Sequence, residues 1–452
     1  MHNYQEDNAM SSWYEDSVFY HMYPLGMTGS PKENRDPQTI HRFNELIKWI
    51  PHIKSLNCTA IYIGPLFESS THGYDTRDYR QVDRRLGDNK DFNEFVRICH
   101  DFGIRVVVDG VFNHTGREFF AFRDIQEKKW DSPYKDWYKG VNFGCSSPMG
   151  DPFSYEAWQG HMILPALNLA NPAVKSYLLE TVQFWTDEFG IDGIRLDCAN
   201  VLDFGFMQEL RRYTEHMKKD FWLMGEVIHG EYSRWVNADM LHSVTNYELH
   251  KSLYSGFNDH NFFEIAHNVR RLEAVGRDLY TFVDNHDEDR IASKLRSKDH
   301  LFPLYLCLFT LPGIPSVYYG SEWGIEGQRT KWSDESLRPA VSISQADSLY
   351  CRLTDQIALL AKIHSEEEAL HHGRYEELLL TNRQYAFARH GQHSVLIAAV
   401  NNDEQEAVLT IPVPVQAGQV CDLISGSAIP ITDNRFAISL KPCDGTILKI
   451  KQ

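Results

Sequence analysis

Short apolar runs alternate with amphipathic segments along most of the chain. The run at 105–112 is apolar on both faces, which is typical of a parallel strand covered by helices. Between the runs, apolar residues recur at helical spacing, as at Phe43, Leu46 and Ile50, and this spacing predicts helices. The predicted strands lie at 18–23, 60–67, 105–112, 191–197, 221–227, 243–248, 279–287 and 316–322, and the predicted helices at 37–56, 91–102, 172–189, 203–219, 260–275 and 299–311.

The number of predicted strands favours one of two α/β architectures. Eight strands separated by helices are what a (β/α)8 barrel requires. The alternative, an open doubly wound sheet, usually has fewer strands and often a glycine-rich phosphate loop. Neither the G-x-G-x-x-G nor the G-x-x-x-x-G-K-[ST] pattern occurs in the chain. We therefore expect the α/β fold class, built as a TIM barrel.

Two stretches depart from the alternation. Residues 115–164 are rich in aromatic residues, proline and glycine, and they are too many for an ordinary βα loop. After a last helix at about 348–370, short strand-like runs predict a small antiparallel β domain. The predicted organisation is a first barrel part at 1–114 (domain A), an inserted subdomain after strand three at 115–164 (domain B), a second barrel part at 165–373 and a C-terminal β domain at 374–452 (domain C).

Composition excludes several classes of protein. The 452 residues include 25 Phe, 22 Tyr and 10 Trp, too many aromatic residues for a disordered chain. The net charge of −17 argues against nucleic acid or an anionic membrane as a partner, because both attract clustered Lys and Arg. A neutral substrate remains compatible with this charge.

The cysteines and the apolar segments bear on location. None of the eight cysteines forms a C-x-x-C pair, and most lie in apolar runs, as Cys307 and Cys351 do. This pattern predicts buried free thiols and a cytoplasmic protein. Residues 1–17 lack the basic and apolar regions of a signal peptide. The most apolar window, 301–317, contains three prolines, so we expect no transmembrane span.

Charged and histidine residues end four of the predicted strands, where a barrel carries its chemistry. Asp and Asn often begin a loop as helix caps, and capping explains any one of these sites about equally well. It does not explain four such ends together, nor Arg195 inside a buried strand on the same face as Asp197. The residues concerned are Asp109, Asn113 and His114 after strand three, Arg195 and Asp197 in strand four, Glu226 after strand five, and Asn285, His286 and Asp287 after strand seven.

A pocket that holds Asp197, Glu226 and Asp287 cannot leave all three carboxyl groups at ordinary pKa values. One acid with a raised pKa beside a carboxylate that Arg195 keeps ionised is the arrangement that glycoside cleavage needs. The competing interpretation is a divalent metal site, as in metal-dependent barrel hydrolases, because Asp, Asn and His also bind such ions. The absence of H-x-H and H-E-x-x-H patterns and the many aromatic residues favour a sugar substrate.

At these residues the chain resembles glycoside hydrolase family 13, the α-amylase family, from about Trp13 to its C-terminus. Each motif alone is a weak signal, but the motifs follow the family's order and fall at the predicted strand ends. They are DGVFNH (109–114), LPALN (164–168), GIRLDCAN (193–200), GEVIH (225–229), FVDNHD (282–287) and PGIPSVYYGSEWGIEG (312–327).

The resemblance implies roles for the three acids. Asp197 would be the nucleophile that forms a β-glycosyl enzyme. Glu226 would protonate the leaving oxygen and later deprotonate the incoming water. Asp287 would hold and distort the sugar ring and help to keep Glu226 protonated. Two inversions would then retain the α configuration.

Further residues match the family's substrate side. His114 and His286 would form hydrogen bonds with sugar hydroxyls on the non-reducing side of the cleaved bond. Tyr74, in HGYDTRDY, matches the family's stacking tyrosine there. A purely structural role is a stronger alternative for Tyr74 than for the acids, because tyrosines are common at barrel rims.

The remaining matches imply support of the site. Arg195 would keep Asp197 ionised, and Asp109 would tie strand three to Arg195. Asn113 matches a residue of the family's calcium site, but a single residue is not enough to bind the ion. The loop at 24–37 also lacks the Asp- and Asn-rich turn of the calcium-binding group. We therefore expect no metal and no cofactor.

The motifs are most similar to the neopullulanase, cyclomaltodextrinase and maltogenic amylase group. That group has an extra N-terminal β domain, whereas about a dozen residues precede the barrel here, so we do not assume its domain-exchanged dimer. Val201 stands where the group has Glu, which leaves α-1,6 cleavage and transglycosylation open. Trp130 and Trp137 could line the cleft, although a solvated face of the insert is the favoured interpretation.

The sequence thus predicts a cytoplasmic, retaining hydrolase for α-1,4 bonds of maltooligosaccharides or cyclodextrins. An exo-acting α-glucosidase or a glucanotransferase on the same scaffold is the first alternative. A non-catalytic relative, such as an amino-acid-transporter heavy chain, would carry a membrane span and lack the carboxylates. For the predicted hydrolase we expect an α-glucan as the partner, with no nucleic acid and no membrane. The sequence leaves undetermined whether the protein is a monomer or a homo-oligomer.

Overall fold

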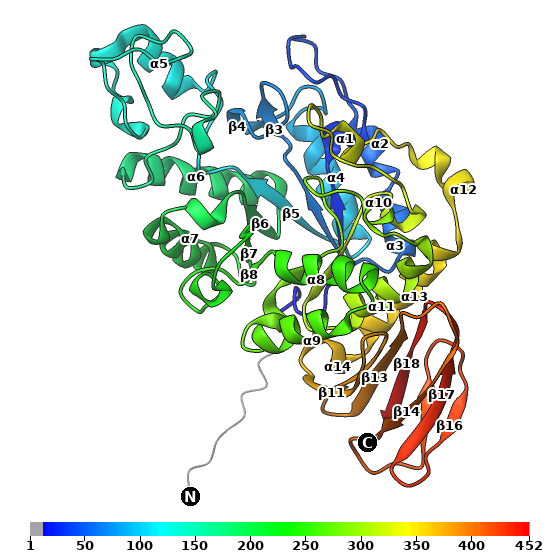
Figure 1. Cartoon of the computed structure of the whole chain (residues 1–452). Coiled ribbons are helices and arrows are strands. Elements are labelled where there is room, and N and C mark those ends of the chain that lie inside the picture. Colours follow the sequence, from blue (N-terminus) through cyan, green and yellow to red (C-terminus); the bar gives the residue numbers. More distant parts are fainter. Residues whose placement is uncertain (1–11, 452) are drawn as a thin grey trace, which may run out of the picture.

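A computed structural model describes residues 12–451 of the chain, and its centre is a parallel barrel (Figure 1). The strand order β8-β7-β6-β5-β2-β1-β10-β9 contains eight strands. A parallel bridge between Thr245 and Tyr280 joins the two ends of this sheet, and the Asn246 N–H donates a 2.8 Å hydrogen bond to the Tyr280 carbonyl. The strands are β1 (Phe19–Met22), β2 (Ala60–Ile63), β5 (Arg105–Gly110), β6 (Gly193–Leu196), β7 (Trp222–Gly225), β8 (Ser243–Val244), β9 (Tyr280–Thr281) and β10 (Ile314–Tyr318). The predicted TIM barrel is confirmed.

Helices surround the barrel and follow the predicted order. Local sequence explains the helix after the insert, which runs from Pro172 to Phe189 as predicted. The Asn171 side chain accepts a hydrogen bond from the Ala173 N–H, Pro172 begins the first turn, and Gly190 ends the helix in the left-handed conformation. The α-helices of the barrel are α1 (Pro24–Met27), α2 (Phe43–Ile47), α3 (Ile50–Ser55), α4 (Asn89–Asp101), α6 (Pro172–Phe189), α7 (Phe204–Met217), α8 (Tyr247–Asn258), α9 (Phe262–Arg271), α10 (Ile291–Lys294), α11 (Leu301–Thr310), α12 (Ala346–Leu349), α13 (Arg352–Glu366) and α14 (Glu368–His371).

Two helices differ from the sequence prediction. The segment predicted as one helix at 37–56 forms α2 and α3, and Pro51, which has no N–H to continue a helix, lies in the first turn of α3. Helix α8 was not predicted. Its N-cap, Asn246, lies inside the run expected to be a strand to residue 248, and β8 ends at Val244 instead.

The barrel interior is filled by side chains rather than left as a pore. Phe19 stacks on Trp222 with ring centroids 4.9 Å apart and meets Tyr280 edge-on at 5.5 Å. These residues belong to a buried cluster with Tyr62 and Ile314. A packed interior leaves the carboxyl ends of the strands as the place for a site.

The segment between β5 and α6 has little regular structure apart from α5 (Phe120–Lys128). Its aromatic residues pack together, with Phe122 against Tyr138, Phe153 and Tyr155, and they are continuous with the core around the barrel. A short antiparallel pair, β3 (Phe67–Ser69) and β4 (Thr76–Val82), precedes it in the chain. Figure 1 shows this segment, in cyan, at one end of the molecule.

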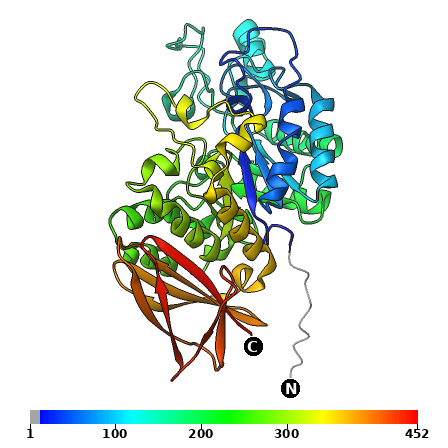
Figure 2. The ribbon, with the colours of Figure 1, turned by 90° about the vertical axis from the view of Figure 1, so that its right-hand side faces the viewer.

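The C-terminal residues form an antiparallel β domain at the opposite end of the molecule, in orange and red (Figures 1 and 2). A six-stranded sheet and a two-stranded sheet enclose a separate apolar core. The buried guanidinium of Arg389 joins this domain to the barrel by donating 2.8 Å hydrogen bonds to the carbonyls of Thr310 and Leu370. The strands are β11 (Arg374–Leu380), β12 (Gln384–His390), β13 (Ser394–Asn401), β14 (Ala407–Pro412), β15 (Gln419–Asp422), β16 (Ala428–Pro430), β17 (Arg435–Leu440) and β18 (Asp444–Lys451). The C-terminal β domain is confirmed, while the three boundaries between the four segments remain a prediction.

The expectation that residues 1–17 hold no signal peptide falls mostly on residues 1–11, outside the described part. Within residues 12–451, no helix combines the length and the apolar character needed to cross a bilayer. All eight cysteines lie in this range and are free thiols, and of these Cys145 and Cys421 are exposed.

Candidate active site

The predicted acids meet in one cavity of about 520 Å³ at the carboxyl ends of the strands. Tyr74, His114, Asp197, Glu226 and Asp287 all line it. Asp109, Asn113, Arg195 and His286 are buried beside these residues. The other lining residues are His72, Trp158, Gln159, His161, Ile163, Leu164, Cys198, Asn200, Val201, Ile228, Tyr247, Glu288, Arg329, Asp334 and Arg338.

The buried guanidinium of Arg195 connects three carboxylates. Its Nη1 donates hydrogen bonds of 3.0 Å to Asp109 and 2.9 Å to Asp197, and its Nη2 lies 3.0 Å from Oε1 of Glu226. Strand pairing accounts for the first contact, because Arg195 on β6 is the register partner of Asp109 on β5. Burial disfavours the charge of Arg195, but Asp109 and Glu226 outweigh it and hold its pKa above the ordinary value. The arginine is therefore a fixed positive charge beneath the acids.

The two acids at the ends of β6 and β7 lie close together. One carboxylate oxygen of Asp197 and one of Glu226 come within 4.8 Å of each other. Because Leu196 of β6 is paired with Gly225 of β7, the next residue of each strand is brought to the same level at the barrel rim. Glu226 also accepts a 3.1 Å hydrogen bond from the Cys198 N–H.

Burial raises the pKa of Glu226, and the neighbouring carboxylates of Asp197 and Asp287 raise it further, although Arg195 opposes them. The Glu226 side chain also lies 3.4 Å from the hydroxyl of Tyr247, which can donate to it. A carboxyl group with a raised pKa keeps its proton to higher pH and can act as a general acid.

Asp287 has the opposite electrostatic environment. Burial would raise its pKa, but His286, Arg338 and Arg195 outweigh burial and hold the pKa of Asp287 well below the ordinary value. Arg338 donates a 2.8 Å hydrogen bond to Oδ1, and His286 Nε2 lies 3.0 Å from Oδ2. About 35% of the Asp287 side chain remains exposed, so an ionised carboxylate faces the cavity.

Tyr74 and His286 form one wall of the site. The Tyr74 hydroxyl lies 2.5 Å from His286 Nε2 and 3.1 Å from Oδ2 of Asp109, and the two rings stack with centroids 5.7 Å apart. Asp109 also accepts a 2.8 Å hydrogen bond from the buried hydroxyl of Tyr62. This network fixes the orientation of a tyrosine that presents part of its ring to the cavity.

His114 also lines the cavity. Burial lowers the pKa of His114 to about 4, so the ring is neutral at ordinary pH. Its Nδ1 lies 3.2 Å from Nδ2 of Asn113, whereas its buried Nε2 has no partner within the described residues. An unpaired ring nitrogen at the cavity can bind a hydroxyl of a ligand.

Several lining residues were not identified from the sequence. Trp158, in the inserted segment, lies with its ring centroid 5.8 Å from that of His114. The other two tryptophans of the insert do not line the cavity, because Trp130 packs on Phe143 with 65% of its surface exposed and Trp137 is buried among other aromatic rings. Arg338 is a further addition, and it lies in a segment with no periodic pattern.

The described residues offer two groups of three potential metal ligands. One is exposed and consists of His41, Asp88 and Asp91, which already form an ion pair and the cap of α4. The other is Asp197, Cys198 and Glu226 in the cavity. Asn113 belongs to neither group.

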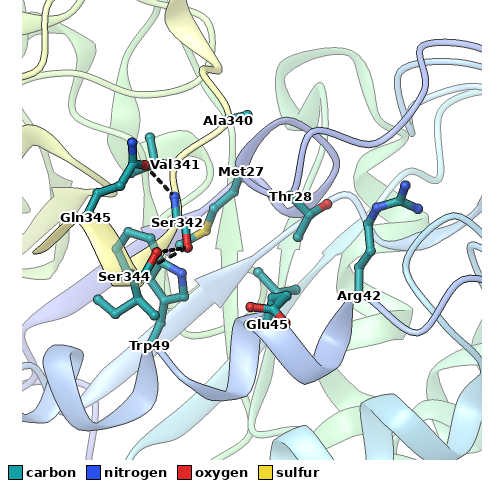
Figure 3. A pocket seen from close by; sticks show the side chains of 12 residues that line it. Met27, Thr28, Arg42, Glu45, Trp49, Ala340, Val341, Ser342, Ser344 and Gln345 are labelled. Carbon is teal, nitrogen blue, oxygen red and sulfur yellow. Dashed lines mark hydrogen bonds between the residues drawn. The ribbon is translucent and has the colours of Figure 1, made fainter.

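A second cavity of about 530 Å³ lies between α2 and residues 340–345 (Figure 3). Figure 3 shows Trp49 and the hydroxyls of Ser342 and Ser344 along its sides. Glu45 is its only carboxylate among the described residues. This cavity therefore lacks the paired acids that acid–base chemistry requires.

Comparisons with known proteins agree with this arrangement. Residues 33–350 match the sequence model of the family described as "Alpha amylase, catalytic domain", and residues 380–445 match "Alpha amylase, C-terminal all-beta domain". The chain is 30% identical over 423 residues to a cyclomaltodextrinase of Thermoanaerobacter pseudethanolicus, covering 88% of this chain and 72% of that protein.

Two solved structures resemble nearly the whole chain. A cyclomaltodextrinase superposes with a TM-score of 0.86 at 26% identity, over 96% of this chain and 78% of the other. A cyclic α-maltosyl-(1→6)-maltose hydrolase of Arthrobacter globiformis superposes with a TM-score of 0.82 at 25% identity, over 98% and 99%.

Proposed function

The chain belongs to the α-amylase family, and from that membership we propose that it is a retaining α-glucan hydrolase acting on α-1,4 bonds of maltooligosaccharides and cyclodextrins. The observation that carries this proposal is the approach of Asp197 and Glu226 to within 4.8 Å. Retaining glycosidases hold their two carboxyl groups about 5–5.5 Å apart, whereas inverting enzymes leave roughly 6.5–9.5 Å for a water molecule.

In the first step, an Asp197 oxygen attacks the anomeric carbon and forms a C–O bond to it. The bond to the leaving sugar breaks, and Glu226 donates its proton to the leaving oxygen. The raised pKa of Glu226 and the ion pair between Arg195 and Asp197 support this division of roles. In the second step Glu226 takes a proton from water, which attacks the same carbon and releases Asp197.

The remaining site residues act on the sugar ring. Asp287, which Arg338 and His286 hold ionised, accepts hydrogen bonds from ring hydroxyls and favours the distorted ring. Tyr74 offers an aromatic face to the same ring, and His114 and His286 bind its hydroxyls. Their positions on the walls of one cavity support these roles.

The substrate class and the location complete the proposal. Relatives named cyclomaltodextrinase support maltooligosaccharides and cyclodextrins as substrates. The match to the cyclic α-maltosyl-(1→6)-maltose hydrolase covers 99% of that chain, which makes the cyclic tetrasaccharide a second candidate substrate. The eight free cysteines support a cytoplasmic location.

A product time course tests the proposal. Maltoheptaose, β-cyclodextrin, pullulan, starch and cyclic α-maltosyl-(1→6)-maltose are incubated with the enzyme, with Asp197→Asn as the control. The anomer released first is followed by proton NMR. We expect cleavage of maltoheptaose and β-cyclodextrin with the α anomer appearing first. Initial release of the β anomer would overturn the retaining mechanism, and an absence of cleavage on all five glucans would overturn the function.

A further inference from the structure

Trp332 is the most exposed large hydrophobic side chain in the described part of the protein, with 85% of its surface accessible. Lys331 forms a cation–π contact with this ring, and its Nζ lies 4.8 Å from the ring centroid. An exposed tryptophan is not unusual by itself, so its meaning depends on the surface that surrounds it.

The Trp332 backbone is nevertheless held in a defined turn. Thr330 accepts a 2.9 Å hydrogen bond at Oγ1 from the Ser333 N–H, and its own N–H donates a 2.9 Å bond to the Ser333 carbonyl. Immediately before this turn, Arg329 donates a 2.8 Å bond to the Asp287 carbonyl. Hydrogen bonds thus tie the backbone around this turn to the loop after β9 that carries Asp287.

Trp332 lines a cavity of about 670 Å³ that adjoins the active site. His72, Asp334 and Arg338 line both cavities, so the cleft continues past Asp287 instead of closing there. The far wall comes from the segment after β1, and an ion pair between Lys32 and Glu335 connects the two walls. In Figure 1 this is where the blue segment after β1 lies beside the yellow segment after β10.

The direction of this extension follows from the neighbours of His286. The ring of Tyr23 stacks on His286 with centroids 5.6 Å apart, and the Arg338 guanidinium lies 4.7 Å from the Tyr23 centroid. The extension therefore leaves the site on the side of Tyr74 and His286, where the ring attacked by Asp197 is bound.

The chemistry of the extension suits a neutral sugar chain. Trp332, Pro31 and Pro339 supply apolar surfaces, and Ser333 and Asp334 supply hydroxyl-binding groups. The C–H face of a glucose ring packs on an aromatic face, whereas its hydroxyls need polar partners at the edge.

We propose that Trp332 is the platform of a distal subsite for an α-1,4-linked glucan, more than one ring from the cleaved bond on its non-reducing side. This inference rests on the proposed function, because the direction of the chain follows from the roles of Asp197 and Glu226. With this distal subsite the cleft is open on the non-reducing side. The enzyme can therefore cleave within a chain, and it favours longer oligosaccharides.

The test compares kcat/KM for maltoheptaose and maltotriose in the wild type, Trp332→Ala, Trp332→Phe and Trp130→Ala. Trp130 is the matched control, an exposed tryptophan on the insert that lines neither cavity. We expect the maltoheptaose-to-maltotriose ratio to fall about ten-fold in Trp332→Ala, the loss of one stacking contact. Trp332→Phe should recover most of the ratio, and Trp130→Ala should keep it.

A second measurement uses maltoheptaose labelled at its reducing end. Loss of the distal subsite should move cleavage toward the non-reducing end, so the labelled fragments become longer in Trp332→Ala. An unchanged ratio and unchanged fragments would overturn the distal subsite. An equal loss on both substrates with an altered oligomeric state would also overturn it, because Trp332 would then serve a subunit contact. If the wild type cleaves neither substrate, the proposed function fails instead.

Discussion

Arg195 donates a 2.9 Å hydrogen bond through Nη1 to Oδ1 of Asp197, two residues further along the same chain. Strand geometry places these alternate residues on one face, so the proposed nucleophile and its counter-ion are positioned together. The same guanidinium also reaches Asp109 and Glu226, and a planar group with several donors is needed to do so.

Replacing Arg195 by Lys should therefore lower kcat by about 10²-fold or more, because a single ammonium cannot satisfy three carboxylates in fixed directions. The measurement is kcat on maltoheptaose together with a thermal unfolding curve. Arg105→Lys is the matched control, since Arg105 forms a half-exposed ion pair with Asp192 outside the site. Equal kcat values in the two variants would contradict the role of Arg195.

Asp197→Asn should remove nearly all turnover while leaving maltoheptaose binding measurable. An amide is a poor nucleophile, and loss of a nucleophile in other hydrolases costs on the order of 10⁴- to 10⁶-fold in kcat. Calorimetric binding of maltoheptaose shows whether the cavity is intact. A variant with near-normal rate would mean that another group attacks the sugar.

The barrel and the acids were predictable because local rules govern them. Helix α6 begins and ends as predicted because Asn171, Pro172 and Gly190 act within one turn of its ends. The acids follow apolar strands, so barrel geometry alone brings them to one rim.

The parts that sequence did not predict depend on tertiary packing. The insert contains Trp130, Trp137 and Trp158, and nothing in its irregular pattern indicates which of them turns toward the cavity. Arg338 and Trp332 lie in a loop held by contacts with distant elements, such as the bond from Arg338 Nε to the His286 carbonyl. Helix α8 was not predicted because the strand expected at 243–248 overlaps its start. In the structure β8 contains only Ser243 and Val244 of that run, and the helix begins at Tyr247.

Exhaustive chelation should leave activity unchanged. Asn113, the residue that suggested a calcium site, lies beside His114, and the loop at 24–37 lacks the Asp- and Asn-rich turn of the calcium-binding group. The check is kcat on maltoheptaose and the unfolding temperature before and after dialysis against EDTA, and again with added calcium. A bound ion that stabilises the fold would raise the unfolding temperature. Activity that disappears and returns with calcium alone would show that our interpretation of this loop is wrong.

The alkaline limit of activity should follow the ionisation of Glu226. Glu226 acts as an acid in its protonated form, so kcat/KM falls as the pH rises through its pKa. Burial and then the charges of Asp197 and Asp287 raise that pKa, which extends the active range upward. Asp287→Asn removes one of the two charges, so the pKa of Glu226 should fall.

Carbon-13 NMR of labelled glutamate carboxyl groups measures this pKa directly, and Glu226→Gln identifies the resonance. The direct measurement is needed because Asp287→Asn also lowers turnover. Glu288→Gln is the control, since Glu288 lines the same cavity but is paired with His250 and Lys294. An unchanged Glu226 titration in Asp287→Asn would mean that burial and Asp197 raise this pKa without Asp287, and that Asp287 contributes only through its contacts with the sugar.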